Sequence, residues 1–148
     1  MRSVTFTVPG PVRGKGRPRT GIVAGHAMIY TDTKTRNYEA EVRAAAANLM
    51  LGQPLLVGPL SVRMTARFAP PASTSRRKLA RMLGGYERPT TKPDSDNILK
   101  VMDALNGVVF RDDAQVCSVA LDKIFADKPG LDVTISTIDF AAELEDII

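Results

Sequence analysis

Residues 92–116 read KPDSDNILKVMDALNGVVFRDDAQV and combine an apolar helical pattern with five aspartates. The spacing predicts a helix over 97–106 that ends at Asn106-Gly107. Its apolar stripe consists of Ile98, Val101, Met102 and Leu105. The aspartates are Asp94, Asp96, Asp103, Asp112 and Asp113. Because carboxylates repel one another, such clustering indicates a bound cation, a helix N-terminus or a solvated loop.

The rest of the chain has the composition of an ordered globular protein. Its 148 residues carry a formal net charge of +4, with 44% hydrophobic and 24% charged residues. We expect one domain, 1–148. No apolar run approaches the roughly 18 residues of a membrane helix and no secretion signal is visible, so we expect a cytoplasmic protein with no membrane partner. The single Cys117 excludes an internal disulfide and a four-thiolate zinc site within one chain, and we expect it to be buried.

Flanking segments predict the fold class. Alternating or β-branched runs predict strands over 4–8, 60–68, 116–125 and 131–140. Helix formers predict a helix over 37–51, with Tyr38, Val42, Ala45 and Leu49 on one side, and a second helix capped by Ser73 or Ser75 before Gly84-Gly85. Residues 9–21 and 86–95 are predicted loops. These elements indicate an α+β (mixed α/β) single domain, with a mixed sheet of about four strands flanked by helices.

The acidic residues favour a metal site. Asp94 and Asp96 lie at the predicted helix start, with Lys100 one turn above Asp96. Asp112 and Asp113 follow the buried run 108–110, which could return them toward the first pair. Carboxylates without His or Cys suit Mg²⁺ before Zn²⁺. Such a site supports phosphodiester hydrolysis by activated water, with Lys100 stabilising the developing charge.

Simpler interpretations of these acids remain open on spacing alone. Asp96 is equally well explained as an N-cap, and Asp94, after Pro93, as a turn residue. The pair Asp112-Asp113 is more typical of a solvated turn than of two metal ligands. Asp103 is expected to pair with Lys100 or to face solvent.

Two basic segments are candidate DNA contacts. The Gly-rich loop 9–21 contains no acid, and residues 76–88 form a second basic stretch. The candidates are Arg13, Lys15, Arg17, Arg19, Arg76 and Arg77, with Lys78, Arg81 and Arg88 nearby. Such side chains position phosphates without identifying bases, although a solvated surface is the simpler interpretation of 76–81. Tyr30 and Tyr38 are expected to pack in the fold, and His26 to be exposed and inert.

The acidic stretch resembles the signature of the RusA family of Holliday junction resolvases. The elements D-x-D-N-x-x-K, D-A-L and D-D-x-Q-V occur in order, with KGRPR near the N-terminus. The resemblance implies a homodimeric endodeoxyribonuclease that uses Mg²⁺, or Mn²⁺ as a substitute, to cut four-way DNA in recombination or repair. It places metal ligands at Asp94, Asp96 and Asp113 and an essential lysine at Lys100. It makes Asp112 a loop residue or a residue that supports the ligands, and the choice between Asp112 and Asp113 as the ligand stays open. It gives Asn97 a supporting role and makes Asp103 structural.

Departures and alternatives accompany this resemblance. Residues 70–92 are longer and more basic than in compact family members, which leaves the DNA contacts open. A nuclease for flaps, forks or duplex DNA, or a junction-binding protein without catalysis, are the alternative functions. The terminal Ile147 and Ile148 give the only hint of a dimer contact in the residues themselves.

Overall fold

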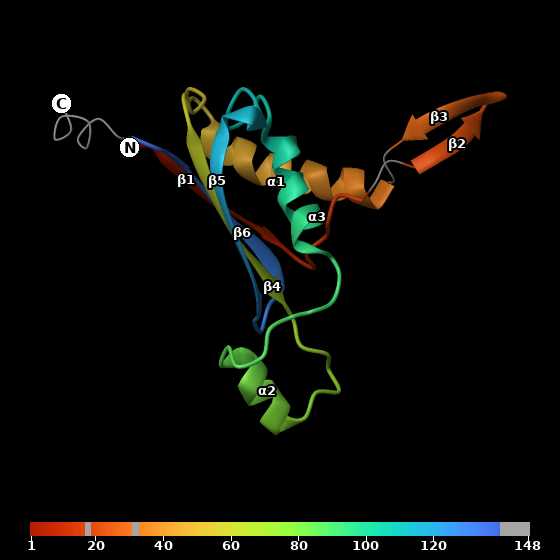
Figure 1. Cartoon of the computed structure of the whole chain (residues 1–148), viewed down its shortest axis with the longest axis vertical. Helices are drawn as coiled ribbons and strands as arrows, with labels where there is room; N and C mark the ends of the chain where they lie inside the picture. The colour runs from red at the N-terminus through yellow and green to blue at the C-terminus, as the bar shows by residue number, and fades with distance from the viewer. Residues whose placement is uncertain (17–18, 31–32, 140–148) are drawn as a thin grey trace.

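A four-stranded mixed sheet forms the centre of the computed structural model, which describes residues 1–16, 19–30 and 33–139 (Figure 1). The strand order is β1-β6-β4-β5, with β1 (Ser3–Pro9), β6 (Gly130–Thr137), β4 (Leu60–Phe68) and β5 (Val116–Phe125). The β1–β6 and β6–β4 pairs are antiparallel, whereas β4 and β5 are parallel. All four predicted strands are confirmed, although β6 ends at Thr137 instead of continuing to 140.

Only one face of this sheet is apolar. Phe6, Met64 and Val133 point to the same side and are buried beneath the helices. The covering elements are α1 (Thr33–Met50), α3 (Ser95–Leu99) and the 3₁₀ helix η1 (Lys100–Leu105). The opposite face carries hydroxyl pairs such as Ser3–Ser136 at 3.0 Å and Thr5–Thr134 at 3.1 Å. The structure therefore confirms an α+β fold with its core between the sheet and one helical layer.

Helix α1 is longer than its propensities predict, and its buried face is rotated relative to the predicted one. It begins at Thr33 instead of residue 37, because Thr35 extends the buried stripe by one turn. The buried residues are Thr35, Tyr38, Val42, Ala46 and Met50. Leu49, expected on the buried side, is 49% exposed, whereas Tyr38 is packed as predicted.

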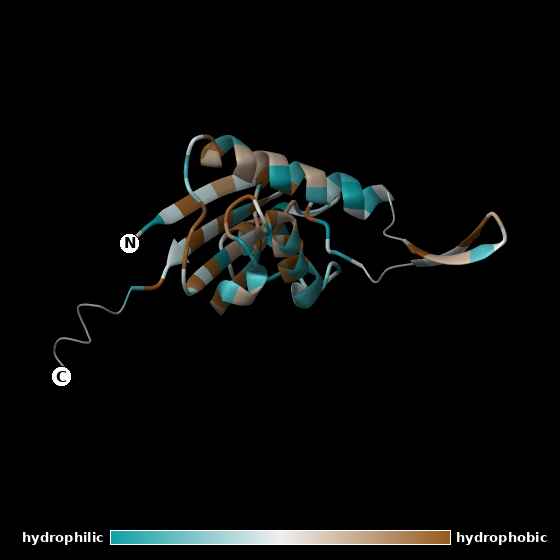
Figure 2. Cartoon of the chain, turned by 90° about the horizontal axis from the view of Figure 1, so that it is seen from above, coloured by the Kyte–Doolittle hydropathy of each residue, from teal (hydrophilic) through white to brown (hydrophobic). Residues whose placement is uncertain are grey.

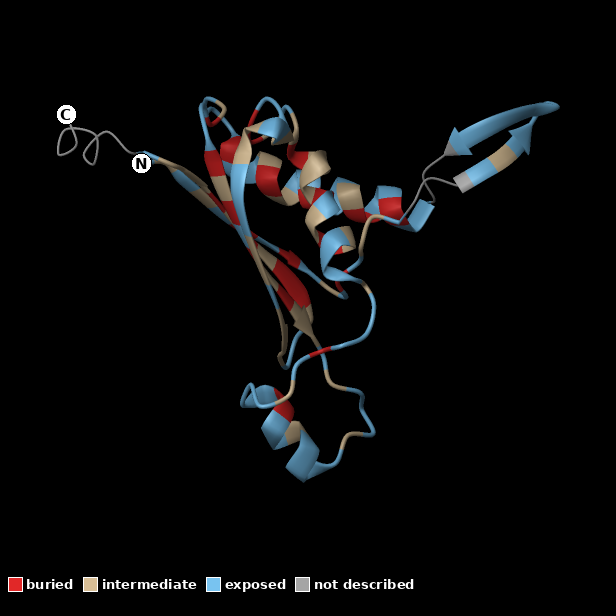
Figure 3. Ribbon diagram, viewed as in Figure 1, coloured by how far each residue is buried: buried red, intermediate tan, exposed pale blue. Residues whose placement is uncertain are grey.

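The connection from β4 to β5 carries both α2 (Arg76–Leu83) and the acidic segment. Ser75 is the N-cap of α2, and its side chain accepts a hydrogen bond from the Lys78 amide at 3.3 Å, which settles the choice between Ser73 and Ser75. Helix α2 projects beyond the end of the sheet, and most of its surface is exposed (Figure 3). The long crossover that a parallel pair requires thus places the acids beside the edge strand β5.

A hairpin occupies part of the predicted N-terminal loop. Strands β2 (Arg19–Val23) and β3 (His26–Tyr30) pair antiparallel and extend away from the domain (Figure 2). Ala24 and Gly25 both have positive φ, 52° and 80°, as a tight two-residue hairpin turn requires. The loop prediction for 9–21 was therefore wrong from Arg19 onward, because Ala-Gly is a weaker turn signal than Asn-Gly. His26 is exposed, as predicted.

Cys117 is exposed, contrary to the prediction of a buried residue. The register between β4 and β5 shifts at this point, with Leu60 opposite Val116 and Ser61 opposite Ser118. Cys117 consequently falls in an irregularity on an edge strand, a position that its apolar neighbours in the sequence do not reveal.

Candidate active site

The acidic segment begins at the N-terminus of α3. Asp94 occupies the N-cap position with extended backbone angles, but its side chain makes no capping hydrogen bond. Asp96 lies inside the first turn, so its interpretation as the N-cap was wrong. The predicted helix over 97–106 is confirmed in position, but it starts at Ser95 and tightens into 3₁₀ geometry from Lys100, as helix C-termini often do. Asp94 and Asp96 are exposed on the surface of this segment.

Apolar side chains anchor the segment and so determine which way the acids face. Ile98, Val101 and Leu105 are buried, and η1 packs against α1. Lys100 remains exposed on the helix, and its Nζ donates to Asn97 Oδ1 at 3.4 Å. Among the residues that the structure describes, no hydrogen bond or ion pair involves the Asp94 or Asp96 carboxylate. These two carboxylates are therefore accessible to a ligand.

Asp113 is held in a different way. Its backbone amide donates to Asn106 Oδ1 at 2.8 Å, and Asn106 Nδ2 donates to Asp113 Oδ1 at 3.2 Å. Both bonds orient the carboxylate at the start of the short 3₁₀ helix η2 (Asp113–Gln115). Asn106 was expected only to end a helix, and no spacing rule assigns it this role.

Asp112 and Gln115 form a capping box around η2. The Asp112 carboxylate accepts from the Ala114 amide at 2.9 Å, while Gln115 Oε1 accepts from the Arg111 and Asp112 amides, both at 3.1 Å. Gln115 Nε2 donates to the carbonyls of Leu56 and Gly58, at 3.2 and 3.1 Å. The glutamine of the D-D-x-Q-V element thus fastens the acidic turn to the chain before β4.

The two groups of acids lie at opposite ends of the α3–η1 segment. At about 1.5 Å per residue in α3 and about 2.0 Å in η1, Ser95 and Asn106 are separated by about 20 Å along the axis. Consistently, no group of three or more Asp, Glu, His or Cys side chains within 1–16, 19–30 and 33–139 is arranged to hold a metal ion. The carboxylate donors suit Mg²⁺ by type, but one chain does not gather three of them. The ligand set Asp94, Asp96 and Asp113 remains a prediction.

Asp103 has a different partner from the predicted one. Its Oδ2 lies 3.4 Å from Lys15 Nζ, and Lys15 also pairs with Glu39 at 3.1 Å. Burial lowers the pKa of Lys15, but the hydrogen bonds and negative charges of Glu39 and Asp103 outweigh burial and raise it. Lys15 is therefore engaged within the protein, although it was predicted as a DNA contact.

The basic loop packs directly on the N-terminal end of α3. The Lys15 amide donates to the Asn97 carbonyl at 2.9 Å. A Cβ on Gly14 would lie 2.8 Å from Asn97 Cβ and 3.0 Å from Pro93 Cβ. Glycine at position 14 is thus required for this close approach, which places the loop beside Asp94.

A pocket of 340 Å³ lies beside this contact between the loop and the acidic helix. It is lined by Val12, Arg13, Gly14, Gly16, Lys34, Thr35, Lys92, Pro93, Asp94 and Asn97. Three cationic residues, Arg13, Lys34 and Lys92, therefore surround the entrance to Asp94. Lys34 and Lys92 were not predicted as site residues, because the spacing does not show that Lys34 in α1 and Lys92 before α3 meet the N-terminal loop.

The other predicted DNA contacts do not join this pocket. Arg76 and Arg77 are exposed on α2, which projects beyond the ends of β4 and β5. Arg17 falls outside the described residues, as do Ile147 and Ile148, and the Arg19 side chain is likewise not described. Burial raises the pKa of Tyr38 to about 12, with Arg13 opposing the shift, so this phenol stays protonated near neutral pH.

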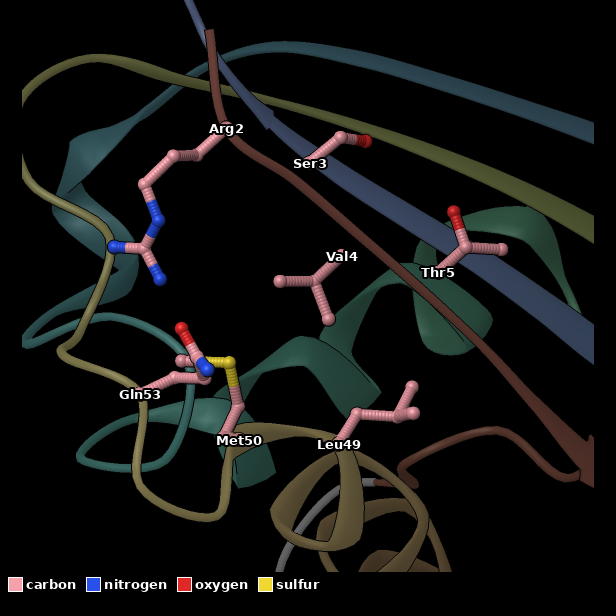
Figure 4. A pocket seen from close by; sticks show the side chains of 7 residues that line it. All are labelled: Arg2, Ser3, Val4, Thr5, Leu49, Met50 and Gln53. Atoms are coloured by element: carbon pink, nitrogen blue, oxygen red, sulfur yellow. The ribbon is translucent and has the colours of Figure 1, made fainter.

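A larger pocket, of 430 Å³, lies between the β1 edge and the end of α1 (Figure 4). Its lining consists of Arg2, Ser3, Val4, Thr5, Leu49, Met50 and Gln53. The one charged side chain among them, Arg2, donates to the Pro54 carbonyl at 2.9 Å and the Leu55 carbonyl at 3.4 Å. This pocket therefore brings together no acid and base, and the smaller pocket beside Asp94 is the candidate site.

None of the helices in the described residues is long and apolar enough to span a membrane.

Comparisons with known proteins identify the family of this chain. The family model for endodeoxyribonuclease RusA matches residues 9–136. A curated relative, the uncharacterized protein YqaN of Bacillus subtilis (strain 168), is 33% identical over 141 residues, which cover 93% of this chain and 99% of that protein. RusA-type nucleases act on DNA and generally depend on a divalent metal. The chain therefore belongs to the RusA family of endodeoxyribonucleases.

Proposed function

We propose that this protein is a Mg²⁺-dependent endonuclease that cuts four-way DNA junctions during recombination or repair. Membership of the RusA family supports the nuclease activity. The acidic signature supports the same conclusion, because its carboxylates and its lysine are all present. Mn²⁺ is the expected substitute for Mg²⁺, since both accept oxygen ligands.

The family resemblance makes Asp94, Asp96 and Asp113 the residues that would hold the metal, with Asp113 at the opposite end of α3–η1 from the first two. Lys100 lies one helical turn after Asp96. A divalent ion bound by these carboxylates would supply an activated water and offset charge on the phosphate. The ammonium group of Lys100 stabilises the negative charge that develops on the phosphate oxygens. Asn106 keeps the Asp113 carboxylate oriented through its two hydrogen bonds.

The observation that carries this proposal is the basic pocket beside Asp94. Negative carboxylates repel a DNA phosphate unless positive charge surrounds them. Arg13, Lys34 and Lys92 supply that charge from three separate segments of the chain. A phosphate drawn to this pocket lies next to Asp94 and the N-terminus of α3, and contacts of this kind position DNA independently of its sequence.

Cleavage of a labelled four-way junction tests the proposal, with Mg²⁺, with Mn²⁺ and with EDTA. We expect cleavage by the wild type that EDTA abolishes, and no cleavage by Asp96→Asn, which retains junction binding. A linear duplex of matched sequence is the control substrate. Equal cleavage of junction and duplex would replace the junction assignment by a general nuclease, and flap or fork substrates then identify the preferred structure. A wild type that binds junctions but cuts none of these substrates would indicate a non-catalytic binding protein.

A further inference from the structure

The β2–β3 hairpin stands apart from the core of the domain. Its strands pair with each other and with no strand of the four-stranded sheet. The hairpin projects away from the helical layer, and nearly all of its described residues are exposed (Figures 2 and 3). With five residues in each strand, at about 3.3 Å per residue, it reaches roughly 15 Å from its base. Because two strands alone are at best marginally stable in water, such a hairpin is expected to pack against a partner.

Both faces of the hairpin carry large apolar side chains. Ile22 and Ile29 share one face, because Ile22 lies opposite Ala27 and alternate residues of a strand point to the same side. These two isoleucines are 80% and 75% exposed. Val23 and Met28 lie on the other face and are exposed as well. An apolar surface of this kind outside the core indicates a contact with another molecule.

The charge around the hairpin favours nucleic acid as that molecule. Residues 19–30 contain no Asp or Glu. The hairpin joins the domain at the pocket beside Asp94, since Gly16 before β2 and Lys34 after β3 both line it together with Arg13. A phosphate held by these cations would lie at the base of the hairpin. A second copy of the chain or a membrane surface fits less well, because neither explains why the hairpin emerges beside the acidic pocket.

We propose that the hairpin enters the branch point of a DNA junction and packs its Ile22–Ile29 face against bases that it displaces from the stack. This inference rests on the proposed nuclease function. Apolar side chains, isoleucine among them, act as wedges between base steps in several classes of DNA-binding protein. Inside a duplex the wedge must break intact stacking, whereas at a branch point the strands already diverge and unstacking costs less. The hairpin thereby favours branched DNA over linear duplex without sequence recognition.

Insertion between bases suits this hairpin better than binding in the major groove. A two-stranded ribbon fits that groove in size, but base recognition there uses hydrogen-bonding side chains. The face that holds the two isoleucines consists of Thr20, Ile22, Ala27 and Ile29, and only Thr20 among them carries a polar group. This face can therefore contact the flat surfaces of bases but offers little to their edges.

The first test uses 2-aminopurine, an adenine analogue whose fluorescence rises when it leaves the base stack. It is placed at the branch point of a four-way junction or, as the control, within one arm. The protein is Asp96→Asn with EDTA, so that the DNA stays intact. We expect a several-fold rise at the branch point, none within the arm, and loss of most of the rise when Ile22→Thr and Ile29→Thr are added. No rise with Asp96→Asn, or an equal rise with the added substitutions, overturns the inference.

The second test compares the affinities of the same proteins for the junction and for a linear duplex of matched sequence. Threonine keeps the β-branched shape that suits a strand but removes apolar surface. The two substitutions should weaken junction binding at least about 10-fold and leave duplex binding within about 2-fold, which also shows that the variant is folded. Val57→Thr is the matched control, since Val57 is 81% exposed in the loop before β4, and it should change neither affinity. Equal weakening on both DNAs, or on neither, contradicts the inference.

Two further measurements examine the other possible occupants of the apolar face. Sedimentation equilibrium should give the same oligomeric state for the wild type and for the variant with Ile22→Thr and Ile29→Thr. Vesicles that contain anionic lipid should not bind the wild type in a co-sedimentation assay. Loss of self-association in the variant would assign the face to a second copy of the chain, and vesicle binding that depends on the two isoleucines would assign it to a membrane; either result overturns the inference.

Cleavage assays separate this inference from the proposed function. A wild type that cuts no DNA contradicts the proposed function, and the fluorescence measured with EDTA still decides on the hairpin. A variant with Ile22→Thr and Ile29→Thr that cuts junctions with the same preference over duplex as the wild type contradicts the role of the hairpin alone.

Discussion

The two ends of the α3–η1 segment hold their acids in contrasting ways. At the N-terminal end, Asp94 and Asp96 are exposed and make no side-chain bond with a described residue. At the other end, Asp113 is fixed by two hydrogen bonds with Asn106, and Gln115 fastens the surrounding turn. One carboxylate is thus oriented before any ligand arrives, while the other two are adjustable. A substitution at Asp113 should consequently change both the stability of the fold and the chemistry of the site. A substitution at Asp94 should change the chemistry alone.

Neutralising one acid at each end gives the largest expected effects. Asp94→Asn and Asp113→Asn should each lower junction cleavage by about 10³-fold or more, because the charge that offsets a metal is lost. Thermal unfolding should separate them, since only Asp113→Asn disturbs hydrogen bonds within the protein. Equal melting temperatures for the two variants would show that the hydrogen bonds of Asp113 do not contribute to the stability of the fold.

The next largest effect should come from Asn106→Ala. It removes both hydrogen bonds of the Asp113 pair and should lower Mn²⁺ affinity and cleavage about 10- to 100-fold, as loss of a ligand-orienting group does. Asn37→Ala, an exposed position in α1, is the matched control and should retain both. If Asn106→Ala keeps full Mn²⁺ affinity, the orientation of Asp113 by this contact is irrelevant to the site.

Gln115→Ala should affect stability more than chemistry. Its side chain makes four hydrogen bonds that join the acidic turn to residues 56–58, and their loss should cost about 2 kcal/mol of unfolding free energy. Urea unfolding measures this value. Gln53→Ala, at an exposed position, should stay within about 0.5 kcal/mol of the wild type. A similar midpoint for both variants would contradict the anchoring role.

The smallest effect concerns Lys15, which pairs with Glu39 and Asp103. Its pKa is raised in the folded protein, so the stability it contributes is present below the unfolded value of about 10.5 and is lost as pH rises through the folded value. Lys15→Met should lower stability by about 0.5 kcal/mol at pH 8, and the gap should close as pH rises beyond the unfolded value of about 10.5 and through the raised folded pKa. Urea midpoints across this range, with Lys78→Met as an exposed control, measure the difference; a constant gap would contradict the ionic origin.

Local patterns predicted the parts of the fold that local forces control. The strand 60–68 alternates polar and apolar residues over its whole length, and the structure places it at Leu60–Phe68. The buried stripe of the acidic helix was predicted for the same reason, since Ile98, Val101 and Leu105 repeat at helical spacing. Errors arose where local signals were weak, as at the Ala24-Gly25 turn, or where a register shift exposed Cys117.

The amino-acid sequence alone was sufficient to identify the family, because the acids, the lysine and the glutamine occur in one short stretch with characteristic spacing. Spacing carries no information on which distant segments meet. That Lys34 and Lys92 surround Asp94, that Lys15 neutralises Asp103, and that α3–η1 holds Asp94 and Asp113 apart all depend on how the helical layer packs on the sheet. Such contacts form through burial of apolar surface from the whole chain, so they become visible only when every element is in place.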